Sequence, residues 1–132
     1  MTGQTKDAGW QIGVSKTLPH PVATVWSLLT SPRGIALWLG SGARLGGPGE
    51  RYETAAGTTG EIRSLHDRDR VRLTWRPEGW DHDTTVQVTV TDAGDGRTVL
   101  RFHQEWLAGA DERERQREHW QAVMARVVEA LG

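Results

Sequence analysis

Five histidines are the residues best suited to metal binding or proton transfer, and they are scattered along the chain. They are His20, His66, His82, His103 and His119. No two of them have the close spacing on one element that zinc sites use, such as H-x-x-x-H. The chain also has no cysteine, which excludes disulfides, thiolate catalysis and thiolate metal sites. We therefore expect no metal and no cofactor.

His103 and Glu105 are a candidate acid/base pair, because residues two apart on a strand share a face. The apolar residues of that strand occupy the opposite face: Leu100, Phe102 and Trp106. If the apolar face lines the core, His103 and Glu105 point outward, where a cross-strand polar contact is the expected role. Gln104 then points inward, and leaving a buried amide unsatisfied costs about 1 to 3 kcal/mol. Gln104 is therefore a candidate for orienting a ligand or an ordered water.

The triplet Asp81-His82-Asp83 also combines metal-binding and acid/base residue types. It lies beside Trp80 between two strand-like segments, where polar residues are typical of a solvated turn. The glycine-rich stretch 40–49 lacks the G-x-x-x-x-G-K-[ST] arrangement of a phosphate-binding loop. We interpret both segments as turns and predict no catalytic residue set.

The elements that must position these residues begin with a strand over residues 10–18. Trp10, Ile12 and Val14 alternate there with small or polar residues, which is the period of a strand with one buried face. Pro21 can then occupy the first turn of a helix. One face of this helix is apolar and is predicted to be buried: Val22, Val25, Trp26 and Leu29.

A second short helix is expected from Pro32 to Trp38, with Ser31 as its N-cap. Strands are predicted next, at 43–45, 51–54, 60–65, 71–75, 86–90 and 100–106. The glycine-rich link 92–96 predicts an antiparallel hairpin. A helix over 111–131 closes the chain, and its apolar stripe contains Trp120, Val123, Met124, Val127, Val128 and Leu131.

Length and charge limit the classes of protein that the chain can be. Its 132 residues suit one domain, and its net charge of -1 gives no general attraction to nucleic acid. Neither a signal peptide nor a run of about 20 apolar residues is present. We expect a flexible segment over 1–9, one domain over 10–132, a cytoplasmic location and no stable membrane insertion.

Four local motifs, in this order and spacing, resemble the START-like helix-grip superfamily, also called the SRPBCC or birch-pollen-allergen-like group. They are the proline-opened helix with Val25-Trp26, Ala36-Leu37-Trp38-Leu39-Gly40, Arg72-Leu73-Thr74-Trp75 after Gly60-Glu61-Ile62, and Glu118-His119-Trp120. Within that group the chain resembles the C-terminal domain of the activator of the heat-shock-chaperone ATPase. The resemblance implies an α+β helix-grip fold, in which a curved antiparallel sheet wraps around the long C-terminal helix and two short helices follow the first strand.

A curved sheet wrapped around a helix tends to leave space between them. We therefore predict noncatalytic binding of a small apolar or aromatic molecule, such as a lipid, between the sheet and the last helix. The predicted ligand-binding residues are Trp38, Tyr52, Trp75, Gln104, Trp106, Trp120 and Met124.

Two other functions stay open. Superfamily relatives include polyketide cyclases, so the same cavity could serve an enzyme of cyclase or aromatase type. A co-chaperone-like interaction domain is the other alternative, although the chain has no counterpart of the activator's N-terminal domain and a chaperone partner is therefore not expected. A homodimer is compatible with the resemblance.

Overall fold

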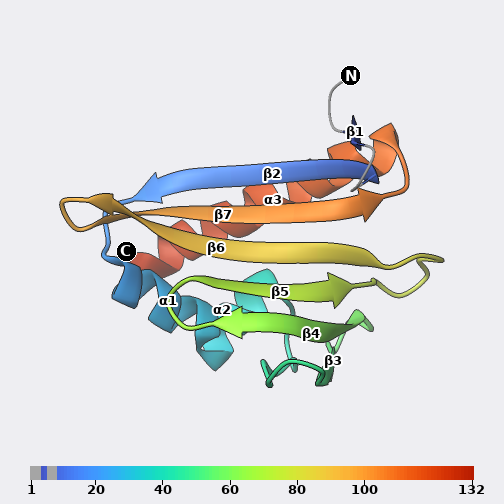
Figure 1. The fold of residues 1–132 in the computed structure, drawn as a ribbon, viewed down its shortest axis with the longest axis horizontal. Coiled ribbons are helices and arrows are strands. Elements are labelled where there is room, and N and C mark those ends of the chain that lie inside the picture. The colour runs from blue at the N-terminus through green and yellow to red at the C-terminus, as the bar shows by residue number, and fades with distance from the viewer. Residues whose placement is uncertain (1–3, 6–8) are drawn as a thin grey trace.

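The strands form one curved antiparallel sheet in a computed structural model that describes residues 4–5 and 9–132 (Figure 1). The seven strands of this described part are β1 (Gln4–Thr5), β2 (Gly9–Leu18), β3 (Arg51–Glu53), β4 (Thr59–His66), β5 (Arg70–Trp75), β6 (Thr84–Gly94) and β7 (Arg97–Leu107). Their order across the sheet is β1-β2-β7-β6-β5-β4-β3. Every neighbouring pair is antiparallel, and the hairpin predicted at 92–96 joins β6 to β7.

Three helices complete the described part of the fold: α1 (Val22–Thr30), α2 (Pro32–Trp38) and α3 (Ala110–Leu131). Figure 1 shows α3 running behind the sheet, and it contacts β2 and β7. The Ser31 Oγ accepts a hydrogen bond of 3.0 Å from the Gly34 N–H and so caps α2, with Pro32 at its first position. The predicted helix-grip fold, with two short helices after the first long strand, is confirmed.

The core lies between the sheet and the helices. Alternate residues of β5, β6 and β7 are buried, as a strand period of two requires for a sheet covered on one face. Trp26 of α1 is 6% exposed, as predicted, and packs with Val25 and Leu29 in the same core. No helix in residues 4–5 and 9–132 is long and apolar enough to cross a membrane.

The strand predicted at 43–45 is wrong. Residues 39–50 carry no strand, because the chain turns repeatedly there. Gly40 and Gly42 adopt φ values of 141° and 85°, which favour glycine, and the Ala43 N–H donates to the Gly40 carbonyl at 3.4 Å. A glycine-rich segment with one short apolar stretch has too little alternating pattern to hold a strand register.

Trp106 does not point into the core, contrary to the prediction. A β-bulge causes the change: Ile12 pairs with Gln104 but Trp10 pairs with Leu107, so β7 has one residue more than β2 in this interval. Trp106 has a φ of 68°, and its side chain is 48% exposed. Leu107 takes the inward position and is 4% exposed.

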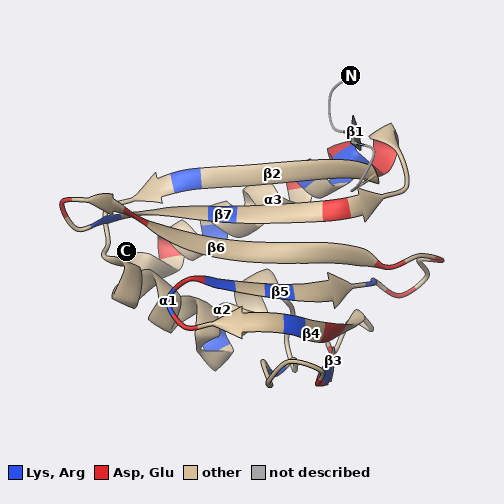
Figure 2. Ribbon diagram, viewed as in Figure 1, with Lys and Arg blue, Asp and Glu red and all other residues tan. Residues whose placement is uncertain are grey.

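The outer face of the sheet is polar and charged. Figure 2 shows basic residues along β2, β4, β5 and β7, while acidic residues lie mainly near strand ends and on α3. Arg72 Nη2 donates to Glu105 Oε1 at 2.8 Å, and His103 Nε2 lies 2.8 Å from Gln11 Oε1. His103 and Glu105 therefore make the cross-strand polar contacts that the alternation predicts.

The β2 edge is the longest free edge in the described part of the sheet. β1 pairs only with Trp10 and Gly9, so residues 11–18 have no strand on that side. Lys16 is paired with the buried Leu100, so Lys16 is in register with the inward-facing residues of the sheet. Lys16 is nevertheless exposed. Most of the segment 1–9, predicted to be flexible, lies outside the described residues, and the assignment of 10–132 to one domain stays a prediction.

Candidate functional site

The end of the sheet beside the start of α3 holds a cluster of five aromatic side chains, named here the aromatic cluster. Its members are Trp75, Trp80, His82, His119 and Trp120. Trp75 is central: its ring centroid lies 5.6 Å from that of Trp80, 5.8 Å from that of His119 and 6.2 Å from that of Trp120. Aromatic pairs at such distances are favourable in tilted and edge-on arrangements.

The strand and helix patterns bring Trp75 and Trp120 together. Trp75 ends β5 on the same face as the buried Val71 and Leu73. Trp120 lies on the buried stripe of α3 and stacks on Phe102 of β7, with ring centroids 5.0 Å apart. Both rings are essentially inaccessible to solvent, so the stack packs α3 directly against the sheet.

A chain of buried hydrogen bonds runs beneath the cluster. Trp120 Nε1 donates to Gln104 Oε1 at 2.8 Å, and Gln104 Nε2 donates to Thr84 Oγ1 at 2.9 Å. Thr84 Oγ1 in turn donates to the Trp75 carbonyl at 2.6 Å. Gln104 is 0% exposed, so its amide is satisfied by protein groups on both sides.

Three buried polar atoms near this chain lack a hydrogen-bond partner among residues 4–5 and 9–132. They are Trp75 Nε1, Gln116 Oε1 and His119 Nε2. Trp75 is 6% exposed and Gln116 is 8% exposed, so both side chains are largely removed from bulk solvent. Gln116 and His119 lie one helical turn apart on α3, and the His119 ring contacts the Trp75 ring. Burial, and secondarily Arg126, lowers the pKa of His119 below its ordinary value, which favours a neutral ring.

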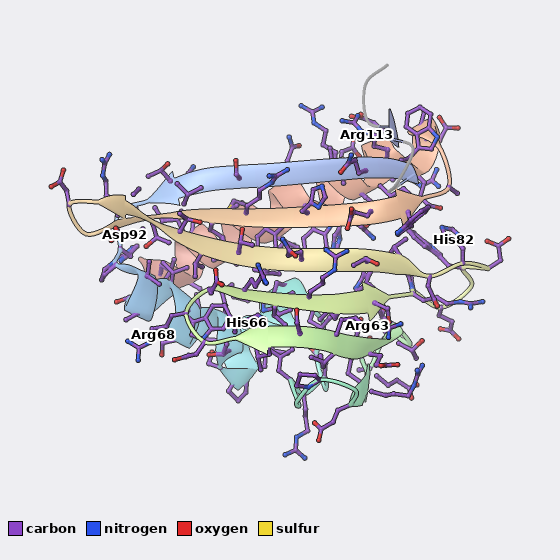
Figure 3. The ribbon with its side chains drawn as sticks, viewed as in Figure 1. Arg63, His66, Arg68, His82, Asp92 and Arg113 are labelled. Carbon is purple, nitrogen blue, oxygen red and sulfur yellow. The ribbon has the colours of Figure 1, made fainter. Side chains whose placement is uncertain are left out.

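Residues 76–83 form a loop, named here the covering loop, that carries Trp80 and His82 over the cluster. Figure 3 shows His82 at the end of the sheet where this loop lies. His82 Nδ1 lies 2.8 Å from Asp81 Oδ1, and its Nε2 lies 2.7 Å from Glu112 Oε1 of α3. Both ring nitrogens of His82 can donate to carboxylates at the same time only when the ring is protonated. The hydrogen bond to Asp81, followed in size by the one to Glu112, therefore raises the pKa of His82. The contact of His82 with Glu112 ties the loop to α3, and protonation of the ring strengthens it.

A surface hollow of about 340 Å³ adjoins this contact. It is lined by Ala108, Gly109, Ala110, Asp111, Glu112 and Arg115. Glu112 belongs to both features, because its Oε1 accepts from His82 and from the Ala108 N–H at 3.0 Å. The hollow therefore reaches the point where the covering loop meets α3.

The structure brings together some of the predicted ligand-binding residues. Trp75, Gln104 and Trp120 meet in the aromatic cluster and the hydrogen-bond chain beneath it. Met124 lies one helical turn beyond Trp120 on the same buried face of α3. The hollows identified in the described part of the chain are lined by other residues, and the aromatic rings pack directly on one another.

The other three predicted residues lie elsewhere. Trp38 Nε1 donates to the Leu29 carbonyl at 2.8 Å and joins α2 to α1. The Tyr52 hydroxyl donates to the Thr74 carbonyl at 2.6 Å, and burial raises its pKa. Trp106 is on the surface because of the bulge. None of the three takes part in the ring contacts found in the described residues.

Sequence reasoning missed Trp80, His82, Glu112, Gln116 and His119. The interpretation of Asp81-His82-Asp83 as a solvated turn is wrong for His82, which contacts α3. Gln116 has charged neighbours in the sequence, but it lies four residues before Trp120 and is therefore on the buried stripe. Helical spacing alone could have identified Gln116, whereas the contact of the covering loop with α3 is tertiary and has no local signal.

The arrangement leaves one candidate acid/base atom free in the described cluster, His119 Nε2. Both nitrogens of His82 are engaged by carboxylates, so neither is available to exchange a proton with a bound molecule in this conformation. No group of three or more His, Asp or Glu side chains in the described ranges could hold a metal ion. The chemistry that the site presents is aromatic contact together with neutral hydrogen-bonding atoms.

Comparison with known proteins places the chain among helix-grip structures. It matches the family model "Activator of Hsp90 ATPase homolog 1-like protein" over residues 19–132. DynU16, a protein of the dynemicin biosynthetic locus, is 25% identical with a TM-score of 0.78, and the match covers 92% of this chain and 46% of that one. The chain thus spans less than half the length of DynU16. No curated protein sequence matched.

Two other similar structures are less than 20% identical to this chain. PFC0360w, an Hsp90 activator from Plasmodium falciparum, is 18% identical with a TM-score of 0.79, and the match covers 94% of this chain and 97% of that one. The Aha1 dimer from Colwellia psychrerythraea is 15% identical with a TM-score of 0.73, covering 92% and 95%. These two likenesses concern the fold. Because the family model spans most of the chain and the architecture agrees, this chain belongs to the Activator of Hsp90 ATPase homolog 1-like family of the START-like helix-grip superfamily.

Proposed function

We propose that this domain binds a small apolar or aromatic molecule, without catalysis, within the aromatic cluster beneath the covering loop. The observation that carries the proposal is the set of buried polar atoms without partners among the described residues: Trp75 Nε1, His119 Nε2, whose ring contacts that of Trp75, and Gln116 Oε1 one helical turn from His119. A native core rarely leaves such atoms unpaired, because each costs about 1 to 3 kcal/mol. A bound molecule that supplied the missing partners would offset this cost.

Binding requires the covering loop to move, because the aromatic rings of the cluster pack against one another. Two contacts from the loop to the rest of the domain are the His82–Glu112 pair and the packing of the Trp80 ring on Trp75. A third hydrogen bond lies within the loop itself, where Arg76 Nε donates to the Trp80 carbonyl at 2.8 Å. Gly79 has a φ of 88° and open space around it, which suits a hinge. Displacement of Trp80 and His82 would connect the hollow at Glu112 with Trp75.

The comparisons agree with a small-molecule function. DynU16 belongs to a biosynthetic locus, where proteins that hold small molecules have an obvious use. Both nitrogens of His82 are engaged by carboxylates, and the free Nε2 of His119 has no carboxylate bonded to it among the described residues, which favours binding over a cyclase reaction.

Two-dimensional NMR of the indole N–H groups tests the proposal, with naphthalene and 2-naphthol as probes. We expect the resonances of Trp75, Trp80 and Trp120 to shift on titration. Trp38, whose indole is bonded to Leu29 in α1, is the internal control and should not shift. The proposal fails if neither probe moves the three cluster resonances, or if shifts are confined to the exposed Trp106.

A space-filling variant provides the second arm of the test. Met124→Trp should fill the region beside Trp120 and weaken binding of both probes, although overpacking costs about 1 to 3 kcal/mol. Ala125→Trp is the matched control, because residue 125 is exposed on the same helix. Circular dichroism establishes that both variants are folded. Unchanged affinity in a folded Met124→Trp protein would remove Met124 from the site.

A further inference from the structure

The aromatic cluster contains hydrogen-bonding groups of a particular kind, and they restrict what it could bind. Trp75 Nε1 is a donor only, Gln116 Oε1 is an acceptor, and the neutral His119 ring can be either at Nε2. All three are buried and none is paired within the described residues. A hydroxyl group can accept from the Trp75 N–H and donate to the Gln116 carbonyl.

The charges around the cluster argue against an ionised ligand. No side chain of Lys, Arg, Asp or Glu is among the buried residues of the described core. A carboxylate or an ammonium group would therefore lose its hydration without gaining an opposite charge. Glu112 stands at the contact between loop and helix and would repel an anion, while its own charge is already shared by His82 and the Ala108 N–H.

The neighbouring tryptophan shows what a satisfied site looks like. Trp120 Nε1 is paired with Gln104, which is paired in turn with Thr84. The ring centroid of Trp75 lies 6.2 Å from that of Trp120. The Trp75 N–H has no amide partner of this kind among the described residues, although Gln116 is buried one helical turn before Trp120. The described part of the fold thus completes one indole–amide pair and leaves the Trp75 N–H and the Gln116 carbonyl oxygen without partners.

We propose that the aromatic cluster selects an uncharged aromatic ligand bearing a hydroxyl group, which Trp75 and Gln116 recognise by hydrogen bonding. This inference rests on the proposed function. The aromatic part of the ligand takes the place beside Trp75 that Trp80 fills in the structure. The hydroxyl group supplies the partners that Trp75 Nε1 and Gln116 Oε1 lack.

Four naphthalene derivatives test the selection by isothermal titration calorimetry at pH 7: naphthalene, 2-naphthol, 2-naphthoate and 2-naphthylmethylammonium. Two added hydrogen bonds should make 2-naphthol bind roughly tenfold or more tighter than naphthalene. Both ions should bind more weakly than naphthalene. Equal affinities for naphthalene and 2-naphthol, or preference for either ion, would overturn the selection while leaving the proposed binding intact. Absence of binding by all four would overturn both.

The variant Gln116→Leu isolates the amide. It should reduce the affinity for 2-naphthol roughly tenfold, leave that for naphthalene unchanged, and raise the melting temperature, because an unpaired buried acceptor is removed. Gln121→Leu is the control on the exposed face of α3 and should alter none of the three. If Gln116→Leu lowers the affinities for both probes equally, or leaves both unchanged, Gln116 does not recognise the hydroxyl group and the inference is wrong.

Discussion

Single polar side chains set the geometry around the aromatic cluster. Gln104 is the clearest case, because its amide receives the Trp120 N–H and donates to Thr84, and so joins α3 to two strands. An apolar residue would fit the same volume but could not make these bonds. The inward position of Gln104 could be predicted from the alternation in β7, whereas its partners could not, since they come from other elements.

Gln104→Leu should destabilise the domain by about 1 to 3 kcal/mol, because the Trp120 N–H would be buried without a partner. Urea denaturation followed by circular dichroism measures the change. Gln87→Leu is the matched control on the outer face of β6, where the only bond lost is the one from Arg72, and it should cost no more than about 0.5 kcal/mol. Similar losses in the two variants would show that the buried bonds contribute little.

His82 gives the domain a pH-dependent contact. Its folded pKa is raised, so the contribution of the contact is complete below the ordinary value of 6.5 and is lost as pH rises through the folded pKa. The difference in unfolding free energy between the parent and His82→Gln should therefore be larger at pH 5 than at pH 8. We expect less than about 1 kcal/mol, since the pair is partly exposed.

The lowered pKa of His119 acts in the opposite sense, because protonation of a buried ring destabilises the fold as pH falls. This contribution is common to the parent and to His82→Gln, so it cancels when the two proteins are compared at each pH. His66→Gln, at an exposed position in the β4 strand, is the control. A difference between parent and His82→Gln that is constant with pH would exclude the proposed protonation.

At the scale of elements, periodicity predicted the long features well. The strands from β4 onward, both short helices and α3 follow from alternation, capping signals and a helical apolar stripe. The bulge in β7 could not be predicted, because an extra residue reverses the faces without changing the residue types. Trp106 was therefore assigned to the interior, and Leu107 is the residue that lies there.

α1 depends on the burial of one large residue. Trp26→Ala should destabilise the domain by about 3 to 5 kcal/mol, because the cavity that it leaves cannot collapse completely against the sheet. A loss of that size is a large fraction of a typical total stability of about 5 to 15 kcal/mol. Thermal and urea unfolding measure it. Thr24→Ala, on the exposed face of α1, should change stability little, and equal losses would contradict the assigned face.

Over the whole molecule, residues distant in sequence form the candidate site. Trp75 ends a strand, Trp80 and His82 follow it in the covering loop, and Gln116 and Trp120 come from α3. The sequence identified Trp75, Gln104, Trp120 and the buried stripe of α3. It could not identify how far the space between sheet and helix is filled, because that depends on side-chain volumes from several elements at once.

The free edge of β2 has a consequence for behaviour at high concentration. An open strand edge with an apolar face can pair with the edge of another molecule and begin aggregation. Lys16 interrupts the apolar register between Val14 and Leu18, and its charge would be buried by such pairing. Lys16→Val should therefore make sedimentation concentration-dependent, whereas Lys16→Glu should leave the protein dispersed. A single lysine that adds nothing to the candidate site would thus protect the domain from self-association.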